Sequence, residues 1–483
     1  MRPAAALAMP WAPDRNLYCA PGRLVLKLAL GETPSWMPTI RDVRTGYREP
    51  ERRIDGGGPI DRVLSRFTAD FRVARLHGAA ASRHQFGRRH LAYTAEEHAF
   101  GLADSLRLKL SREVPVGSLV DALRQVTAVA AVAPHYLCLQ PAAVPAPVAP
   151  DQGDGWVSRD LVRASEALAY EPGDPALIVG IVDTGVDPER AELHERLRAG
   201  FDTVQLGPMD LATGLHLVGD LSEEDMEPLD EVGHGTGCAG IIGALGESLP
   251  PGLAGEARVL PIRVLGSAAM PGKDAPVGVG ALPDIDDGLK RAIDLGAKVL
   301  NLSFGTPLTL LEEHDPLPHE DVVKYGLAHG CIMIAASGNS GKEERFSPAC
   351  LDGVIAVSAV DDDGAPADFS TRGDHVALAA PGVRVLSAGL SGSARLTGTS
   401  FAAPFVTAAT ALLVARALRR ATPLNVGDAR RILRESARPF TGGPQAGCGA
   451  GILDAAEALR QLDRSIDQNG HRVSALDLAA ADG

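Results

Sequence analysis

The sequence predicts a large α/β domain, a parallel sheet with helices on both faces, preceded by a small α+β domain. Apolar runs alternate with helical segments from residue 156 onward, two β-α-β patterns precede them, and a proline- and glycine-rich stretch separates the two parts. The 483 residues suffice for two or three domains, and 45% of them are hydrophobic. No stretch approaches about 18 consecutive apolar residues, so we expect no transmembrane segment.

The first part, residues 1–140, has the pattern of two successive β-α-β units. Alternating apolar residues predict strands, and helical spacing predicts helices between them: strands at 23–30, 71–76, 105–110 and 128–132, helices at 60–71 and 116–126. Two such units favour a small antiparallel sheet with two helices on one face, a ferredoxin-like arrangement.

Residues 141–155 predict an exposed linker. The segment begins with four prolines among alanines and valines and ends in Asp-Gln-Gly-Asp-Gly. Proline stiffens such a chain, glycine loosens it, and neither builds a core, so a domain boundary falls here.

The second part, residues 156–460, alternates β-branched apolar runs with helical segments. We predict buried strands at 176–182, 257–265, 297–302, 331–336 and 354–360, and helices at 234–246, 283–295, 319–329 and 400–419. An acidic insertion within 202–232 interrupts this rhythm and predicts a surface loop. The polar, weakly patterned residues 461–483 predict a flexible C-terminal tail.

Charge is unevenly distributed along the chain. Overall, 47 Lys and Arg against 61 Asp and Glu give −14, which argues against a general nucleic-acid-binding protein. Residues 1–140 carry 20 basic and 13 acidic residues, a net charge of +7, so the remainder carries −21. A basic N-terminal part therefore faces an acidic remainder.

The cysteines and the N-terminus give weaker signals. The six cysteines are widely spaced, without the short C-x-x-C pairs of a zinc site, which favours buried free thiols over disulfides. The start has one arginine and a short apolar stretch interrupted by Pro10, which is too short and broken for a convincing signal peptide. The sequence leaves open whether the protein stays inside the cell or the start is misplaced.

Four short segments of the second part carry chemically useful side chains. Asp183 lies where a buried strand ends in a Thr-Gly turn, and His234 lies at the start of a helix of small residues. Asn339 follows another buried strand, and Ser400 lies at the start of the predicted helix 400–419. Each has an ordinary structural explanation on its own: a capping or turn aspartate, a capping histidine, a turn asparagine and an N-cap serine.

Together the four residues predict an activated serine nucleophile. An imidazole must take the serine proton, a carboxylate must orient the imidazole, and an amide with a backbone N–H at the helix start binds the oxyanion. The order Asp183, His234, Ser400 is the order found in subtilisin.

The segment from about 156 to 460 resembles the subtilisin family (subtilases) of serine proteases. The resemblance rests on Asp183-Thr-Gly-Val-Asp187, Gly233-His-Gly-Thr-Gly-Cys-Ala-Gly240, Ala335-Ala-Ser-Gly-Asn339 and Gly398-Thr-Ser-Phe-Ala-Ala-Pro404, with further agreement at 299–305, 346–350, 380–382 and 449–454.

The resemblance implies a serine endopeptidase acting on protein or peptide substrates, with Ser400 as nucleophile, His234 as base and acid, and Asp183 as orienting carboxylate. It implies that Asn339 donates to the oxyanion and that substrate adds as a strand along the cleft. The residues that would line the cleft and its specificity pocket are Ser303, Phe304, Gly305, Ala336, Ser337 and Gly338.

The sequence departs from the family pattern in two ways. Many relatives have a second histidine where this chain has Gly237, a position outside the triad. The insertion places His234 51 residues after Asp183, and it is expected to border the cleft and to narrow or charge it. No cofactor is implied; many subtilases bind calcium, for which carboxylates at 220–231 are candidates, although a solvated acidic loop explains them as well.

The N-terminal part resembles the family's inhibitory propeptides more weakly, most closely at Val132-Ala-Pro134-His-Tyr136. This implies a zymogen whose N-terminal domain assists folding, inhibits, and is removed by self-cleavage between about Leu137 and Trp156. An unrelated binding domain is the alternative for this part, and an inactive protease-like binding protein is the alternative for the whole chain. A serine esterase is rejected, because it would need a Gly-x-Ser-x-Gly motif with the serine first.

Overall fold

The computed structural model describes residues 19–80, 93–140, 156–207, 210–211, 215–221 and 225–481. The predicted linker at 141–155 and the N-terminal start lie outside these residues.

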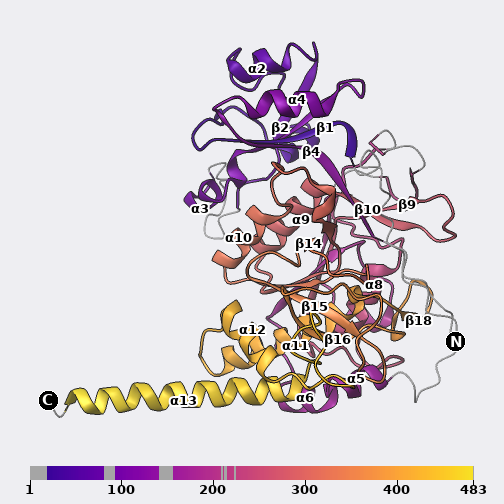
Figure 1. Ribbon diagram of the computed structural model, residues 1–483, viewed down its shortest axis with the longest axis vertical. Helices are drawn as coiled ribbons and strands as arrows, with labels where there is room; N and C mark the ends of the chain where they lie inside the picture. The colour runs from indigo at the N-terminus through magenta and orange to yellow at the C-terminus, as the bar shows by residue number, and fades with distance from the viewer. Residues whose placement is uncertain are drawn as a thin grey trace.

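The second part of the chain is built on a seven-stranded parallel sheet (Figure 1). In spatial order the strands are β16 (Val376–Pro381), β15 (Val354–Val360), β13 (Ile332–Ala336), β11 (Val299–Leu302), β5 (Ile178–Asp183), β8 (Arg258–Arg263) and β6 (Phe201–Asp202). Side chains on these strands are almost all buried, because helices cover both faces, as the β-branched runs predicted.

Two long helices pack on each face of this sheet. Helices α8 (His234–Gly243) and α11 (Thr399–Arg419) share one core with it, and α9 (Leu282–Asp294) and α10 (Glu320–Ala328) share the other. Among the described residues α11 alone is long and apolar enough to cross a membrane, but 83% of its most apolar window is buried, as in a core helix. The predicted α/β fold with helices on both faces is therefore confirmed.

Smaller elements complete this part. They are α5 (Val157–Leu161), α6 (Ala164–Tyr170), α7 (Ala191–His194), α12 (Val426–Glu435), β7 (His216–Leu217), β9 (Gly266–Ala269), β10 (Val277–Ala281), β12 (Thr306–Pro307), β14 (Phe346–Ser347), β17 (Val385–Ala388) and β18 (Ser393–Leu396).

The N-terminal region forms an antiparallel sheet with its own core. Its strands lie in the order β2 (Phe71–Arg75), β3 (Ser105–Leu110), β1 (Cys19–Leu28) and β4 (Val129–Gln140). Helices α2 (Pro59–Leu64) and α4 (Val116–Arg124) pack on it through a separate apolar cluster, and the short helices α1 (Ile40–Arg44) and α3 (Ala95–Ala99) lie in the connections.

Strand β4 is longer than the predicted 128–132 and belongs to both regions. Its first part pairs with β1, and Leu137–Gln140 pairs antiparallel with β10 of the second region. The added pairing explains the extra length, because β10 supplies a second edge beyond the end of β1.

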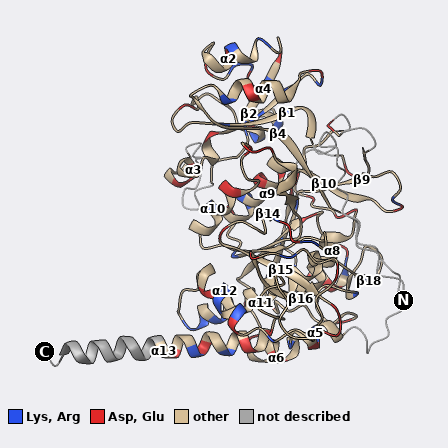
Figure 2. Cartoon of the chain, viewed as in Figure 1, with Lys and Arg blue, Asp and Glu red and all other residues tan. Residues whose placement is uncertain are grey.

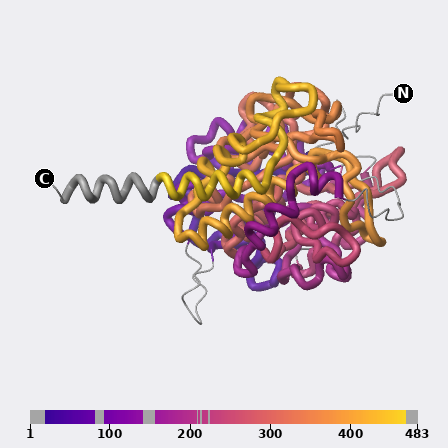
Figure 3. Tube along the Cα trace, turned by 90° about the horizontal axis from the view of Figure 1, so that it is seen from below, coloured from indigo at the N-terminus to yellow at the C-terminus, as the bar shows by residue number. Residues whose placement is uncertain are grey.

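The first residues of the segment 461–483, for which the sequence predicts a flexible tail, belong to helix α13 (Ala455–Ala481). Figure 3 shows the first turns of this helix lying along the underside of the molecule. Leu462 is buried, and Asp463 accepts hydrogen bonds from Arg416 on α11 and Tyr170 on α6, which anchors the helix beyond residue 460. All six cysteines are free, as predicted.

Candidate active site

The structure brings Asp183 and His234 together at the carboxyl edge of the sheet. Strand β5 ends at Asp183 and helix α8 begins at His234, whose Nδ1 lies 2.8 Å from Asp183 Oδ1. The same oxygen accepts the Thr184 backbone N–H at 2.7 Å, and both side chains of the pair are buried. The carboxylate therefore holds the proton on Nδ1, which leaves Nε2 as the acceptor facing the cleft.

Glycines on α8 allow this close approach. A Cβ atom at Gly235 would lie 2.0 Å from the Gly185 carbonyl oxygen, so only glycine lets the helix meet the Asp183 turn. At Gly237 a Cβ would lie 2.4 Å from Leu396 Cδ1, so the histidine that many relatives have here has no room unless Leu396 moves.

Ser400 lies in the first turn of α11, next to the end of β11. Its Oγ donates to the Ser303 carbonyl at 3.2 Å, and Ser303 Oγ donates back to the Ser400 carbonyl at 2.7 Å. The Phe401 ring packs 4.9 Å from the His234 ring, centroid to centroid. Phe401, the neighbour of Ser400 on α11, thus contacts the candidate base, while the Ser400 hydroxyl is hydrogen-bonded to Ser303.

Asn339 lies beside Ser400 with its amide orientation fixed. Its Oδ1 accepts hydrogen bonds from the Thr399 backbone N–H and the Thr399 hydroxyl, both at 2.9 Å. Because α11 holds the oxygen end, the Nδ2 end is the one available to a developing oxyanion.

Most of the predicted cleft residues line one pocket around Ser400. Ser303, Phe304 and Gly305 are on it, together with Ala336, Gly338 and Asn339. Ser337 is not: it is buried, and its hydroxyl donates to the Thr371 carbonyl at 2.9 Å. Phe346 and Thr399 also line the pocket. Both lie in segments that resemble the family, 346–350 and 398–404, but neither was predicted to line the cleft.

Strand β4 of the N-terminal region fills this cleft. Gln140 at its end places Nε2 2.8 Å from His234 Nε2, and the same nitrogen donates to the Ser303 carbonyl. Two residues earlier on β4, Cys138 Sγ lies 3.6 Å from the Gly305 carbonyl oxygen. Since Asp183 fixes the proton on Nδ1, Gln140 is the donor and His234 Nε2 the acceptor. The nitrogen that would take the serine proton is therefore engaged by this chain's own glutamine.

Ion pairs join the two regions along the rest of their interface. Four of them place a lysine or arginine of the N-terminal region against an aspartate of the second region. They are Arg23–Asp210 (2.8 Å), Lys27–Asp321 (2.7 Å), Arg107–Asp284 (2.7 Å) and Arg124–Asp315 (2.6 Å). Lys290–Glu97, at 2.6 Å, has the opposite polarity. Figure 2 shows acidic residues on α9, directly below the N-terminal sheet.

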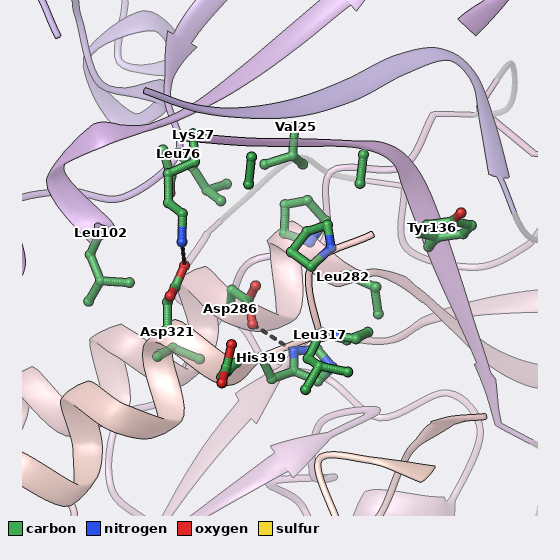
Figure 4. A pocket seen from close by; sticks show the side chains of 18 of the residues that line it. Val25, Lys27, Leu76, Leu102, Tyr136, Leu282, Asp286, Leu317, His319 and Asp321 are labelled. Carbon is green, nitrogen blue, oxygen red and sulfur yellow. Dashed lines mark hydrogen bonds and ion pairs between the residues drawn. The ribbon is translucent and has the colours of Figure 1, made fainter. Parts of the chain in front are cut away.

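A cavity of about 100 Å³ remains at this interface, between β1 and β4 on one side and the start of α10 on the other (Figure 4). The Lys27–Asp321 pair crosses it, and His319 on its floor has Nδ1 2.6 Å from Asp286 Oδ1.

The acidic insertion is organised around Arg263. This buried guanidinium contacts the carboxylates of Asp202, Asp220 and Glu231. Burial raises the pKa of Asp202 to about 6 in spite of Arg263. Asp230 instead accepts the backbone N–H groups of 232, 233 and 236, which caps the start of α8.

One group of described side chains has the spacing of a metal site: Asp183, His234 and Cys238, the triad pair with a neighbouring thiol. Burial and the charge of Asp183 raise the pKa of Cys238 well above its ordinary value, so the thiol stays protonated and is a poor metal ligand.

A buried carboxylate, an oriented imidazole, a serine at a helix start and a fixed amide, all at one edge of a parallel sheet, define the class of subtilisin-like serine endopeptidases. Comparison with known proteins agrees: residues 174–451 match the Subtilase family. The chain belongs to this family.

Similar proteins include a thermophilic serine proteinase from Bacillus sp. (strain AK1), 33% identical over 49% of this chain and 52% of that protein. Thermitase from Thermoactinomyces vulgaris is 32% identical over 53% of this chain and 80% of its own length. The chain thus spans about half of the first relative. Among solved structures, a protease from Pseudoalteromonas arctica PAMC 21717 aligns with a TM-score of 0.54 and 25% identity, over 64% of this chain and 97% of that one.

Proposed function

We propose that this chain is an active serine endopeptidase made as a self-inhibited zymogen. The observation that carries the proposal is the contact of Gln140 with His234, because it joins the assembled catalytic pair to a strand that enters the cleft as an extended peptide. Residues 1–140 are the inhibitor in this proposal, and self-cleavage in the following segment removes them.

The reaction uses only side chains and backbone of this chain. His234 Nε2 takes the proton of Ser400 Oγ as the oxygen attacks the peptide carbonyl, and Asp183 stabilises the resulting imidazolium. Asn339 Nδ2 and the Ser400 backbone N–H donate to the oxyanion. His234 then protonates the leaving amine, and water hydrolyses the acyl-enzyme by the same steps, returning the proton to Ser400.

The proposal also includes the ferredoxin-like arrangement and the propeptide role of the N-terminal domain. Support comes from the strand order β2-β3-β1-β4 with two helices on one face, and from the cation-to-aspartate polarity of most interface pairs described above. We also propose that Arg263 balances the negative charge of the carboxylates in the insertion. We assign no residue as a ligand of a structural calcium ion.

The test is labelling with a fluorophosphonate after the purified protein has been incubated until its mass is constant. Wild type and the control Ser391→Ala, an exposed serine outside the cleft, should label, and Ser400→Ala should not. An unlabelled wild type would identify the chain as an inactive, protease-like binding protein.

A further inference from the structure

We propose that a cationic groove on the N-terminal sheet binds a compact anion that carries several phosphate groups. This groove shares no described lining residue with the cleft around Ser400. The binding site is independent of the proposed endopeptidase function, whereas its effect on release of the N-terminal region rests on that function.

The groove has a volume of about 520 Å³, which is within the range of small-ligand sites. Five basic side chains line it: Arg23, Arg44, Arg72, Arg107 and Lys109. The other described lining residues are apolar except Gln205, and none of them is acidic or aromatic. The lining therefore attracts a multiply charged anion and offers no ring on which a nucleobase could stack.

Three of these basic residues form a row across adjacent strands. Arg72 on β2 lies directly opposite Lys109 on β3, which in turn lies directly opposite Arg23 on β1. The neighbouring residues Leu24 and Leu108 pack in the core beneath α2 and α4, so the row lies on the other face of the sheet. Because adjacent strands are about 4.8 Å apart, the row spans roughly 10 Å.

This arrangement is costly without an anion. Like charges directly opposite each other destabilise a sheet, and Asp210 compensates the Arg23 end of the row through a bidentate contact. Two residues before Lys109, Arg107 is buried and donates from Nη1 to Asp284 at 2.7 Å. Its buried Nε has no hydrogen-bond partner among the described residues, which carries a desolvation cost. An anion in the groove would offset both costs.

The backbone around the groove argues against an extended peptide as the ligand. The outer edge of β2 is already paired, because Val73 exchanges both backbone hydrogen bonds with Glu51 at 2.9 Å and the Arg75 N–H donates to the Pro38 carbonyl. A peptide could not add as a strand at these positions. Phosphate groups instead offer three acceptor oxygens and nearly two charges each, which suits forked guanidinium groups better than single carboxylates.

The groove is connected to the interface between the two regions through Arg23 and Arg107. These residues also hold Asp210 and Asp284 of the catalytic region. After release the two aspartates are absent, so an anion would meet the full charge of both arginines and bind the released region more tightly. A ligand that binds one state more tightly shifts the equilibrium toward it, so the anion should favour release.

The experiment is titration calorimetry of tripolyphosphate into full-length Ser400→Ala protein at constant ionic strength, with citrate as the carboxylate comparison. The test variant adds Arg72→Gln/Lys109→Gln, which removes two exposed bases of the row. The matched control adds Arg62→Gln/Arg66→Gln, which removes two exposed bases at and after α2. Circular dichroism checks the folding of each protein, and Arg72→Gln alone replaces the test variant if the double replacement does not fold.

We expect one site for tripolyphosphate, with a Kd that rises at least about tenfold in the test variant and stays unchanged in the control. Added NaCl should weaken binding, and citrate should bind at least about tenfold more weakly than tripolyphosphate. In protein with Ser400 intact, tripolyphosphate should shorten the time to peptidase activity, and NaCl at equal ionic strength should shorten it less.

Absence of binding, or equal affinity in the test variant and the control, would overturn the site. Citrate that binds as tightly would overturn its assignment to phosphate, and binding that leaves activation unchanged would overturn the coupling to release. Protein with Ser400 intact that never shortens or becomes active would instead refute the self-activating protease. Binding to Ser400→Ala needs no activity, so the two failures are distinguishable.

Discussion

The catalytic region and the N-terminal region differ in how they use polar groups. In the catalytic region, Asp183, His234 and Asn339 are buried and held by groups of the same region. The N-terminal region has a core of its own and meets its neighbour through one shared strand, two shared apolar clusters and a set of ion pairs. The groups that carry the chemistry thus all come from the catalytic region, and the N-terminal region contributes the strand that occupies the cleft.

The largest effects are expected at the triad, in the region that carries the chemistry. Ser400→Ala or His234→Ala should lower kcat about 10⁶-fold, and Asp183→Ala on the order of 10⁴-fold, the scale known for subtilisin. Steady-state hydrolysis of a peptide substrate measures this. Near-normal activity of Ser400→Ala would remove the serine from its role as nucleophile.

Stability should also separate the two regions. On a Ser400→Ala background, which prevents self-cleavage, Arg263→Met should lower the free energy of unfolding by about 3–5 kcal/mol. The reason is that the substitution leaves the buried Asp202 carboxylate without its ion-pair partner. Lys27→Met, which breaks a partly exposed interface pair with Asp321, should cost at most about 1 kcal/mol. Denaturant unfolding monitored by circular dichroism gives both values, and equal costs would contradict the contrast.

Asn339→Ala should lower kcat by roughly 10²–10³-fold with little change in KM, the range known for the subtilisin oxyanion-hole asparagine. The reason is that Asn339 Nδ2 stabilises the substrate carbonyl oxygen mainly in the transition state, when this oxygen carries negative charge. Loss of substrate binding with kcat intact would place Asn339 outside the oxyanion site.

The smallest effect concerns pH at the interface. Burial, and then the charges of Arg107 and Arg23, lower the pKa of His135 on β4 well below its ordinary value. Below about pH 6.5 this histidine therefore binds a proton in the unfolded chain but not in the folded chain. The free energy of unfolding is accordingly highest above this pH and falls as the pH is lowered.

Between pH 6.5 and 5.5 this should amount to about 1 kcal/mol in Ser400→Ala. The groups facing His135 are Arg107 and Arg23, which pair with Asp284 and Asp210 across the interface. Ser400→Ala/His135→Leu should lose less stability over the same interval, and a loss equal in both proteins would exclude His135 as the cause.

The sequence predicted most of the catalytic sheet and the four chemical residues because both have local signals. Buried parallel strands are continuous β-branched runs, and the triad residues lie in short motifs of small residues. Strand β16 lacked that signal, since Val-Ala-Leu-Ala-Ala-Pro is alanine-rich and ends in proline. Strand β10 was missed because its two glycines lower strand propensity, and only its pairing with β4 and β9 makes it a strand.

The contact of Gln140 with His234 joins residues that are 94 positions apart in the sequence, so no local pattern predicts it. The available hints were the weak propeptide resemblance at 132–136 and the position of Gln140 just before the proline run. Likewise, the packing of the insertion on Leu137 and Leu139 depends on the long-range register of β4 against β10. Local patterns thus predicted the groups that react, and tertiary packing decided what occupies the cleft.

The central claim, a protease whose own strand occupies its cleft until it is cut, is tested most directly by intact mass spectrometry of purified protein over time. Wild type should shorten to a catalytic fragment with a new N-terminus between about Leu137 and Trp156, with peptidase activity rising in parallel, while Ser400→Ala stays whole. Full-length wild type that is already fully active and never shortens would contradict the claim and make the N-terminal region a permanent accessory domain.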